Sequence, residues 1–130
     1  LFIKLPSGRK LCYWNTHLKM DPRDGRERIV YMGVNQETKQ WGETETYGGK
    51  LVENITQAIA RDCLAISMQR VAALGYNIVM HVHDEMIVDV PIEDTDALER
   101  INACMGEAIP WAPGLPLRGD GYETPFYMKD

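Results

Sequence analysis

The longest regular pattern of hydrophobic positions runs from Lys50 to about Leu74, and its period is that of an α-helix. When residues are placed about 100° apart, its apolar side chains fall within a narrow arc. They are Leu51, Ile55, Ile59 and Ile66, with Val52 and Cys63 beside them. Tyr47-Gly48-Gly49 precedes the segment and Gly75 follows it, so we expect one long amphipathic helix.

The opposite side of this predicted helix carries a polar stripe. It consists of Lys50, Asn54, Gln57 and Arg61. A stripe of this kind is usually a face in contact with solvent. Because its members recur at helical spacing, the stripe is also a candidate binding surface, and the pattern alone leaves both interpretations open.

The segment before the helix is rich in short β-type runs. Residues 1–5 and 9–14 enclose the turn tripeptide Pro6-Ser7-Gly8, which predicts a β-hairpin. A polar loop is expected next, with Asp21-Pro22 and Asp24-Gly25 as its turn signals. After this loop, a strand at 28–34 and a returning segment at 39–44 predict a second hairpin.

Another hairpin is expected after the helix. Residues 78–82 and 86–90 are β-rich, and the three residues between them, His83-Asp84-Glu85, are few enough for a hairpin corner. A second helix should run from about Glu93 to Ile109, with Thr95 or Asp94 as its N-cap. Its apolar stripe is formed by Leu98, Ile101, Met105 and Ile109.

The tail from Leu115 to Asp130 predicts one further strand, followed by the aromatic residues Tyr122, Phe126 and Tyr127. The order of elements predicts an α+β fold, with one long and one shorter helix packed on one face of a mainly antiparallel sheet. We treat residues 1–130 as one domain made of three regions. These are the hairpin region 1–46, the long helix 47–75, and the second hairpin, helix and strand at 76–130.

Composition adds few constraints to this picture. The chain has 130 residues, of which 45% are hydrophobic and 25% charged, and no apolar run approaches the roughly 20 residues of a membrane span. It starts with Leu1 inside a predicted strand, so we expect it to begin within a larger protein. The net charge of −5 argues against a free-standing nucleic-acid-binding protein, which usually has a basic surface.

The three cysteines, Cys12, Cys63 and Cys104, share no CxxC spacing, which suits reduced thiols in a cytosol.

The hairpin corner is the main candidate for chemistry. Asp84 and Glu85 could be an ordinary acidic turn. They could also hold a divalent cation such as Mg²⁺, which takes carboxylate oxygens as ligands. A third interpretation is a zinc pair, His81 and His83 on one strand face, which would need further ligands.

The residues Val82-His83-Asp84-Glu85-Met86-Ile87-Val88 resemble the VHDE segment, often called motif C, of family A (polymerase I type) DNA polymerases. Three other segments are similar to parts of phage-type members of that family and occur in the same order. They are Leu5-Pro6-Ser7-Gly8-Arg9-Lys10-Leu11 (the hairpin that follows the fingers), Tyr47 to Leu51 with Glu53 to Asp62 (the long palm helix), and the tail from Gly121-Tyr122 through Phe126-Tyr127 to Lys129-Asp130.

The resemblance implies roles for the hairpin corner. Asp84 matches the second metal-binding aspartate of the family, which helps to hold two Mg²⁺ ions at the primer 3′ end. Glu85 matches its acidic neighbour, and His83 matches a histidine close to the primer terminus, which we interpret as a contact to the DNA backbone. His81 matches no residue with a role that we can carry over.

The resemblance also implies DNA contacts along the long helix. Gln57 matches a glutamine that lies against the minor groove, where an amide can test the shape of any base pair because every pair presents acceptors there. Lys50, Asn54 and Arg61 share its face and are candidate DNA contacts. Bacterial members have an asparagine four positions before the glutamine, where this chain has Glu53, and for Asp62 we expect a structural hydrogen-bonding role.

Taken together, these matches imply the C-terminal palm portion of a DNA-directed DNA polymerase, acting in the cytoplasm of a bacterial or phage-infected cell. Its partners would be primer–template DNA, dNTP and the remainder of the polymerase chain, with no membrane. The first catalytic aspartate and the nucleotide-binding helix lie upstream of these segments in the family, so we expect the isolated chain to be inactive and to self-associate through exposed apolar surface. The alternatives are a metal-dependent phosphoesterase and a non-catalytic prophage remnant or DNA-associated module.

Overall fold

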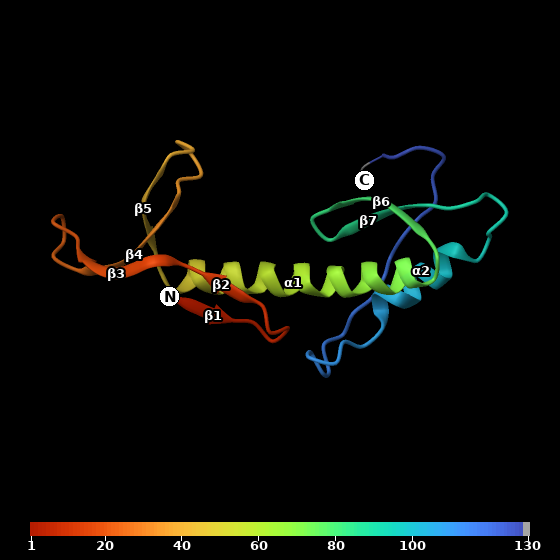
Figure 1. Cartoon of the computed structure of the whole chain (residues 1–130), viewed down its shortest axis with the longest axis horizontal. Coiled ribbons are helices and arrows are strands. Elements are labelled where there is room, and N and C mark those ends of the chain that lie inside the picture. The colour runs from red at the N-terminus through yellow and green to blue at the C-terminus, as the bar shows by residue number, and fades with distance from the viewer. Residues whose placement is uncertain (129–130) are drawn as a thin grey trace. The chain divides into compact units, whose positions relative to one another are not determined.

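The computed structural model describes residues 1–128 (Figure 1). These residues contain seven strands and two helices, in two units that divide between Ile59 and Ala60. In chain order the elements are β1 (Phe2–Lys4), β2 (Lys10–Cys12), β3 (Trp14–Met20), β4 (Glu27–Val34), β5 (Trp41–Thr46), α1 (Gly48–Ala73), β6 (Asn77–Val82), β7 (Glu85–Asp89) and α2 (Ala97–Gly106).

All strand pairs in this part of the chain are antiparallel, which confirms the predicted α+β class with one long and one shorter helix. The strands do not share one sheet. They form the hairpin β1–β2, the three-stranded sheet β3–β4–β5 and the hairpin β6–β7. The first two belong to the first unit and the third to the second unit.

The first hairpin forms where the turn tripeptide predicted it. The backbone N–H of Leu5 donates to the carbonyl of Arg9 at 2.8 Å, and Gly8 between them has φ of +90°, a conformation that glycine adopts without steric cost. Leu5 is only 2% exposed, so the turn is anchored in the core of the first unit. The guanidinium of Arg9 donates to the carbonyl of Ala58 in α1 at 3.0 Å.

Residues 15–20, which we expected to belong to a polar loop, form strand β3 together with Trp14 and pair with β4. The prediction failed because the strand does not bury alternate apolar side chains. Leu18 and Met20 are about as exposed as the polar residues beside them, at 60% and 58%. The loop itself is confined to the Asp21–Arg26 turn, where the N–H of Gly25 donates to the carbonyl of Asp21 at 2.8 Å.

The core of the first unit centres on Tyr13, which is 6% exposed. Its ring meets the ring of Tyr31 edge to face, with centroids 5.1 Å apart, and its hydroxyl accepts a hydrogen bond from Asn54 of α1 at 3.0 Å. Val30 from β4 and Ala58 from α1 are buried in the same unit. Aromatic packing and one partly buried amide contact therefore join the strand region to the helix.

Helix α1 begins and ends within two residues of the prediction, and Gly75, with φ of +91°, follows its end. Its buried side differs from the predicted one. The residues of the predicted arc, Leu51, Ile55, Ile59 and Ile66, are only half-buried, and Val52 is 60% exposed. The buried positions are Ala58, Cys63, Leu64, Ser67 and Val71. Because the helix serves two units, one apolar arc does not describe its packing along the whole length.

Helix α2 is shorter than predicted, and Asp96 precedes it without a side-chain capping bond. Neither Thr95 nor Asp94 caps it. The carboxylate of Asp94 instead accepts a hydrogen bond from the hydroxyl of Tyr76 at 3.0 Å and pairs with Arg100. Ile109 lies beyond the end of the helix, yet it is among the most deeply buried residues of the second unit, at 2% exposure.

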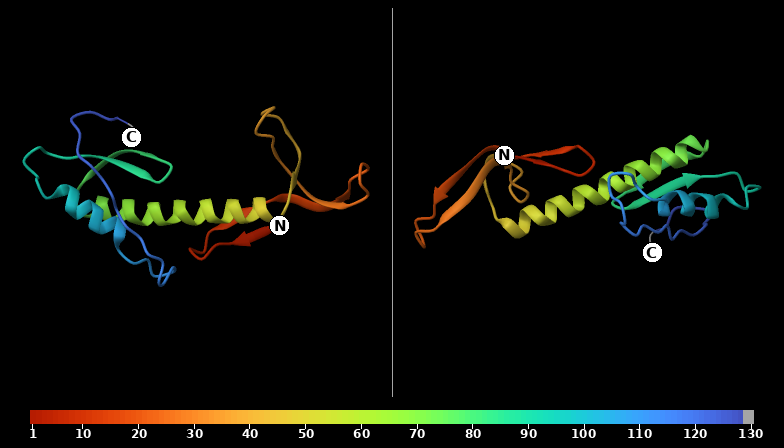
Figure 2. Two further views of the ribbon diagram at one scale, coloured as in Figure 1. Left: turned by 180° about the vertical axis from the view of Figure 1, so that it is seen from behind. Right: turned by 90° about the horizontal axis from the view of Figure 1, so that it is seen from below.

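Arg70 fastens the C-terminal end of α2 to α1. Its guanidinium donates to the carbonyls of Glu107 at 2.9 Å and Ala108 at 2.8 Å, with a longer contact of 3.5 Å to Cys104. Glu107 and Ala108 directly follow the last helical residue, Gly106, and only Cys104 lies in the last turn, where the carbonyls have no partner within the helix. These bonds therefore satisfy carbonyls at and just beyond the helix end that would otherwise need water. In both Figure 1 and Figure 2, α2 lies beside the C-terminal half of α1.

The tail contains no strand up to residue 128, so the predicted C-terminal strand is wrong for this part of the chain. The tail packs on α2 instead. A Cβ atom on Gly119 would lie 2.7 Å from the Cα and carbonyl oxygen of Asn102, and one on Gly121 would lie 3.0 Å from Leu98. The tail backbone therefore takes the space that side chains would occupy. Lys129-Asp130, part of the resemblance, lies outside the described residues.

Two further expectations concern composition. All three cysteines are free thiols, with Cys12 exposed, Cys63 buried and Cys104 half-buried. No helix in the described part of the chain is long and apolar enough to cross a membrane.

Replacing Arg70 by Met should lower the free energy of unfolding by about 1–3 kcal/mol, because it removes the charge-assisted hydrogen bonds to the carbonyls of Glu107 and Ala108. Urea denaturation followed by circular dichroism measures this change. Arg61→Met in the same helix is the matched control. Arg61 is exposed and has no ion pair within residues 1–128, so its replacement should change stability by less than about 0.5 kcal/mol. Equal effects of the two substitutions would contradict the proposed fastening.

Candidate functional site

The hairpin β6–β7 places the three residues of the predicted corner in different structural positions. Val82 pairs with Glu85, so the turn consists of His83 and Asp84 alone. Glu85 is the first residue of β7 and is half-buried, whereas His83 and Asp84 are exposed. Asp84 therefore stands at the tip of the hairpin, fixed by strands that begin directly on either side of the turn.

The backbone of His83 is left-handed, with φ of +52°. A two-residue hairpin turn needs a positive φ at its first position when the strands keep their right-handed twist, and glycine or asparagine usually supplies it. Histidine is one of the few other residues enriched in this region. A residue held in such a conformation is often found at a functional site, so the geometry makes His83 a candidate in its own right.

The carboxylate of Asp84 has neither a hydrogen bond nor an ion pair with any residue from 1 to 128. It is exposed, so it keeps its hydration at no cost and remains available to a cation. A carboxylate in this state can supply one or two oxygen ligands to Mg²⁺. The turn of the hairpin thus presents one exposed acidic group, held between two paired strands.

The predicted zinc pair on one strand face is wrong in its geometry. His81 lies in β6, but the strand ends at Val82 and His83 belongs to the turn. Within the described residues, no group of three or more histidine, cysteine, aspartate or glutamate side chains could hold a metal ion. Asp84 is therefore at most part of a metal site, and its other ligands would have to come from outside this hairpin.

The polar stripe of α1 contains an organised cluster in the first unit. The ammonium of Lys50 donates to both carboxylate oxygens of Glu53, at 3.0 and 2.9 Å. The amide of Gln57 donates to one of these oxygens at 3.4 Å. The hydrogen bond from Lys50 to Glu53 raises the pKa of Lys50 above its ordinary value. Glu53, noted in the sequence only as a departure from the bacterial pattern, is the centre of this cluster.

The other members of the stripe differ in their surroundings. Asn54 is half-buried, and its amide is engaged with the hydroxyl of Tyr13. Arg61, on the part of α1 in the second unit, is exposed. Asp62 next to it is half-buried, and its negative charge adds to the effect of burial in raising the pKa of the Cys63 thiol.

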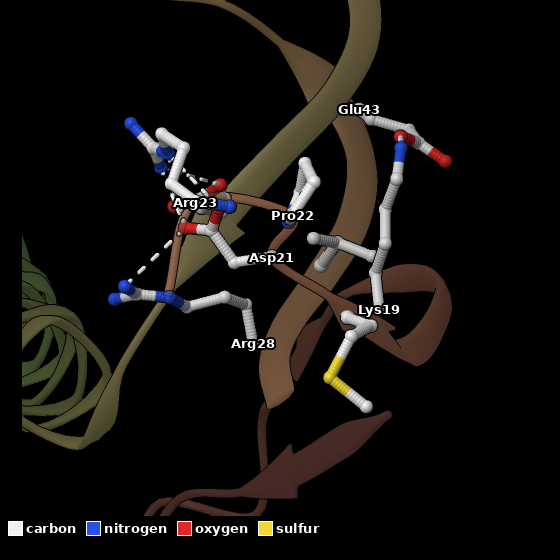
Figure 3. Close-up of a pocket in the computed structure, with 9 residues that line it drawn as sticks. Lys19, Asp21, Pro22, Arg23, Arg28 and Glu43 are labelled. Atoms are coloured by element: carbon white, nitrogen blue, oxygen red, sulfur yellow. Dashed lines mark hydrogen bonds and ion pairs between the residues drawn. The ribbon is translucent and has the colours of Figure 1, made fainter. Parts of the chain in front are cut away.

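A pocket of about 210 Å³ that the sequence did not predict lies on the three-stranded sheet (Figure 3). It contains Asp21, whose carboxylate is 3% exposed and accepts from the guanidinium of Arg23 at 2.7 Å, with Arg28 at 3.3 Å. These contacts, led by the hydrogen bond from Arg23, hold the pKa of Asp21 far below its ordinary value. The acidic and basic side chains that line the pocket balance, so it has no net charge to attract an ion.

The comparisons with known proteins give one relative. A DNA polymerase from Bacillus phage SP02 is 53% identical over 130 residues, which is 100% of this chain and 20% of that protein. The chain thus spans about a fifth of the length of the curated relative that it matches. No family model matches, and no solved structure matches. The relative supports the sequence-based resemblance at the level of a phage DNA polymerase.

The buried carboxylate of Asp21 predicts a specific acid response. Its folded pKa lies below its unfolded pKa of about 3.9, so its contribution to stability is complete above about pH 4 and is lost as the pH falls toward the folded value. In Asp21→Asn, the urea midpoint should be lower at pH 6 and should fall less between pH 4 and pH 2.5 than in the unaltered chain. Asp120→Asn, at an exposed carboxylate, is the control and should keep the original pH dependence.

Proposed function

We propose that this chain is the palm portion of a phage-type family A DNA polymerase and that it takes part in template-directed nucleotidyl transfer from dNTP to a primer 3′ end. The observation that carries the proposal is the 53% identity over the entire chain to a phage DNA polymerase. The sequence motifs described above also resemble those of phage-type DNA polymerases, the class of protein to which this relative belongs. The geometry adds that the residue matching the metal-binding aspartate, Asp84, is exposed and has no cationic partner within residues 1–128.

In this proposal Asp84 is one ligand of a Mg²⁺ site, and the remaining ligands come from the rest of the polymerase chain and from the substrate phosphates. Bound Mg²⁺ would activate the attacking 3′ oxygen and stabilise the leaving one. The hairpin pairing fixes the position of the carboxylate, which matters because a displacement of about 1 Å can cost 100-fold in rate.

The neighbours of Asp84 have separate roles. Glu85 is the first residue of β7 and does not belong to the turn. It therefore adds negative charge near the metal site but is not held in the same position as Asp84. The exposed imidazole of His83 can donate a hydrogen bond to a phosphate oxygen of the primer. The left-handed backbone of His83 forms the tight turn from which the side chains of His83 and Asp84 extend.

The stripe of α1 is the proposed surface for the minor groove. Gln57 presents an amide, which can both donate and accept, and minor-groove acceptors are common to all base pairs. Glu53 holds the amide of Gln57 and the ammonium of Lys50, so the two polar groups are ordered before DNA arrives. Arg61 is an exposed cation on the same helix, suited to a phosphate contact. Asn54 serves the core through Tyr13.

A metal-dependent phosphoesterase would need its ligands gathered in this chain, and residues 1–128 contain no such group. A non-catalytic remnant differs from a polymerase in the DNA that encodes it. An in-frame aspartate motif upstream of Leu1, with a helix bearing spaced Arg, Lys and Tyr residues, would support the polymerase, whereas a start codon directly before Leu1 would support the remnant.

The decisive test of Asp84 uses a chimera in which this chain replaces the matching segment of the SP02 DNA polymerase. Primer extension by the chimera should fall by more than about 100-fold on Asp84→Asn, because even the loss of an outer-shell partner of a metal ligand commonly costs about 10–100-fold. Asp89→Asn is the matched control, an exposed acid at the other end of the same hairpin, and should retain activity. An active Asp84→Asn chimera would refute the assignment.

The isolated 130-residue chain should show no template-directed incorporation of dNTP, because Asp84 alone does not complete a two-metal site. Primer extension on a gel measures this, and isothermal titration calorimetry should find only weak Mg²⁺ binding. Tight zinc binding would favour the phosphoesterase, and robust incorporation would show that the missing aspartate and nucleotide-binding helix are not needed.

A further inference from the structure

The charges of this chain are divided unevenly between its two units. Residues 1–59 contain nine of the 14 lysines and arginines but only seven of the 19 acidic residues. The remaining residues contain five basic and twelve acidic side chains. The net charge of −5 therefore conceals a basic first unit. Its first 20 residues contain four basic side chains and no acidic one.

Within the first unit, most cations of the three-stranded sheet and of α1 are paired with carboxylates. These pairs are Lys19 with Glu43, Arg23 with Asp21, Arg26 with Asp24, Arg28 with Asp21 and Asp24, and Lys50 with Glu53. By contrast, Lys4 and Lys10 of the first hairpin have no carboxylate partner in the part of the chain that the structure describes. Apart from Lys39 on the β4–β5 turn, the two lysines of β1–β2 are therefore the lysines of the first unit without a carboxylate partner among the described residues.

The register of this hairpin sets the two lysines directly opposite each other. Opposed side chains on adjacent strands have Cβ atoms about 4.5–5.5 Å apart, and like charges in that position destabilise a hairpin. Both lysines are exposed and share their face with exposed Phe2 and Cys12. The opposite face carries Ile3 and Leu11, which are half-buried. The lysine pair therefore lies on the solvent side of the hairpin.

We propose that the outer face of β1–β2 binds the phosphodiester backbone of DNA through Lys4 and Lys10. This inference rests on the proposed polymerase function and adds a contact surface to it. A phosphate between the two ammonium groups would remove their repulsion, and no carboxylate competes for them within the first 20 residues. Lysine suits this role because its ammonium is a compact charge with three donors, which contacts phosphate without requiring a fixed geometry.

The charge reversal Lys4→Glu separates this proposal from a purely structural one. It replaces a like-charge pair by an opposite-charge pair with Lys10, so it should raise the urea midpoint of the chain. The same substitution should weaken binding to a fluorescent primer–template duplex by at least about fivefold to tenfold at 0.1 M salt, the order expected for one lost phosphate contact. A structural lysine would not give these opposite changes in stability and affinity.

The double variant Lys4→Gln/Lys10→Gln tests the number of contacts. By fluorescence anisotropy, the slope of log affinity against log salt concentration should become shallower by about 1.8, since each phosphate contact contributes about 0.9. Lys39→Gln, an exposed lysine on the β4–β5 turn of the same unit, is the control and should leave the slope nearly unchanged.

The outcomes distinguish this proposal from the proposed function. If the unaltered chain binds DNA and the hairpin variants bind equally well, the hairpin surface is refuted and the polymerase assignment stands. If Lys4→Glu lowers the urea midpoint, repulsion between Lys4 and Lys10 does not destabilise the hairpin, and the proposal loses its physical basis. If the unaltered chain shows no DNA binding at low salt, the hairpin surface is refuted and the DNA-binding role of the first unit falls with it.

Discussion

The guanidinium of Arg70 is the contact on which the second unit depends. Helix α2 has only ten residues and no side-chain cap at its start, and isolated helices of this length are marginal in water. Arg70 donates to the carbonyls of the two residues that follow its last residue, so the exit from the helix is held by a residue from another element. The tail also packs on α2, where the backbone of Gly119 lies close to Asn102.

Local sequence signals predicted the elements that are decided locally. The period from Lys50 to Leu74 and the glycine after it gave the bounds of α1, and Pro6-Ser7-Gly8 gave the first hairpin. The predictions of β3 and of the α2 cap failed because tertiary contacts, which local sequence signals do not show, decide both. Strand β3 exposes Leu18 and Met20, so no alternation marked it, and Asp94 was unavailable as a cap because Tyr76 and Arg100 hold it.

The candidate site shows the same division. The residue types at the hairpin corner indicated Asp84 from the sequence, but only the strand register separates it from Glu85 and places His83 in the turn. The pattern of α1 identified Gln57 and Lys50, whereas their common partner Glu53 follows from side-chain geometry. Asp21 is a turn residue as predicted, but its burial and its second partner, Arg28 of β4, follow only from the folded sheet.

The left-handed backbone of His83 limits which residues evolution can place beside Asp84. The strands on both sides favour β-branched side chains, and these are the residues that a positive φ excludes most strongly, at a cost of about 1–2 kcal/mol. Glycine and asparagine fit the backbone but provide no imidazole. A lineage that drifts at this position therefore either keeps histidine or gives up the imidazole, because few other residues combine a ring N–H donor with this backbone conformation.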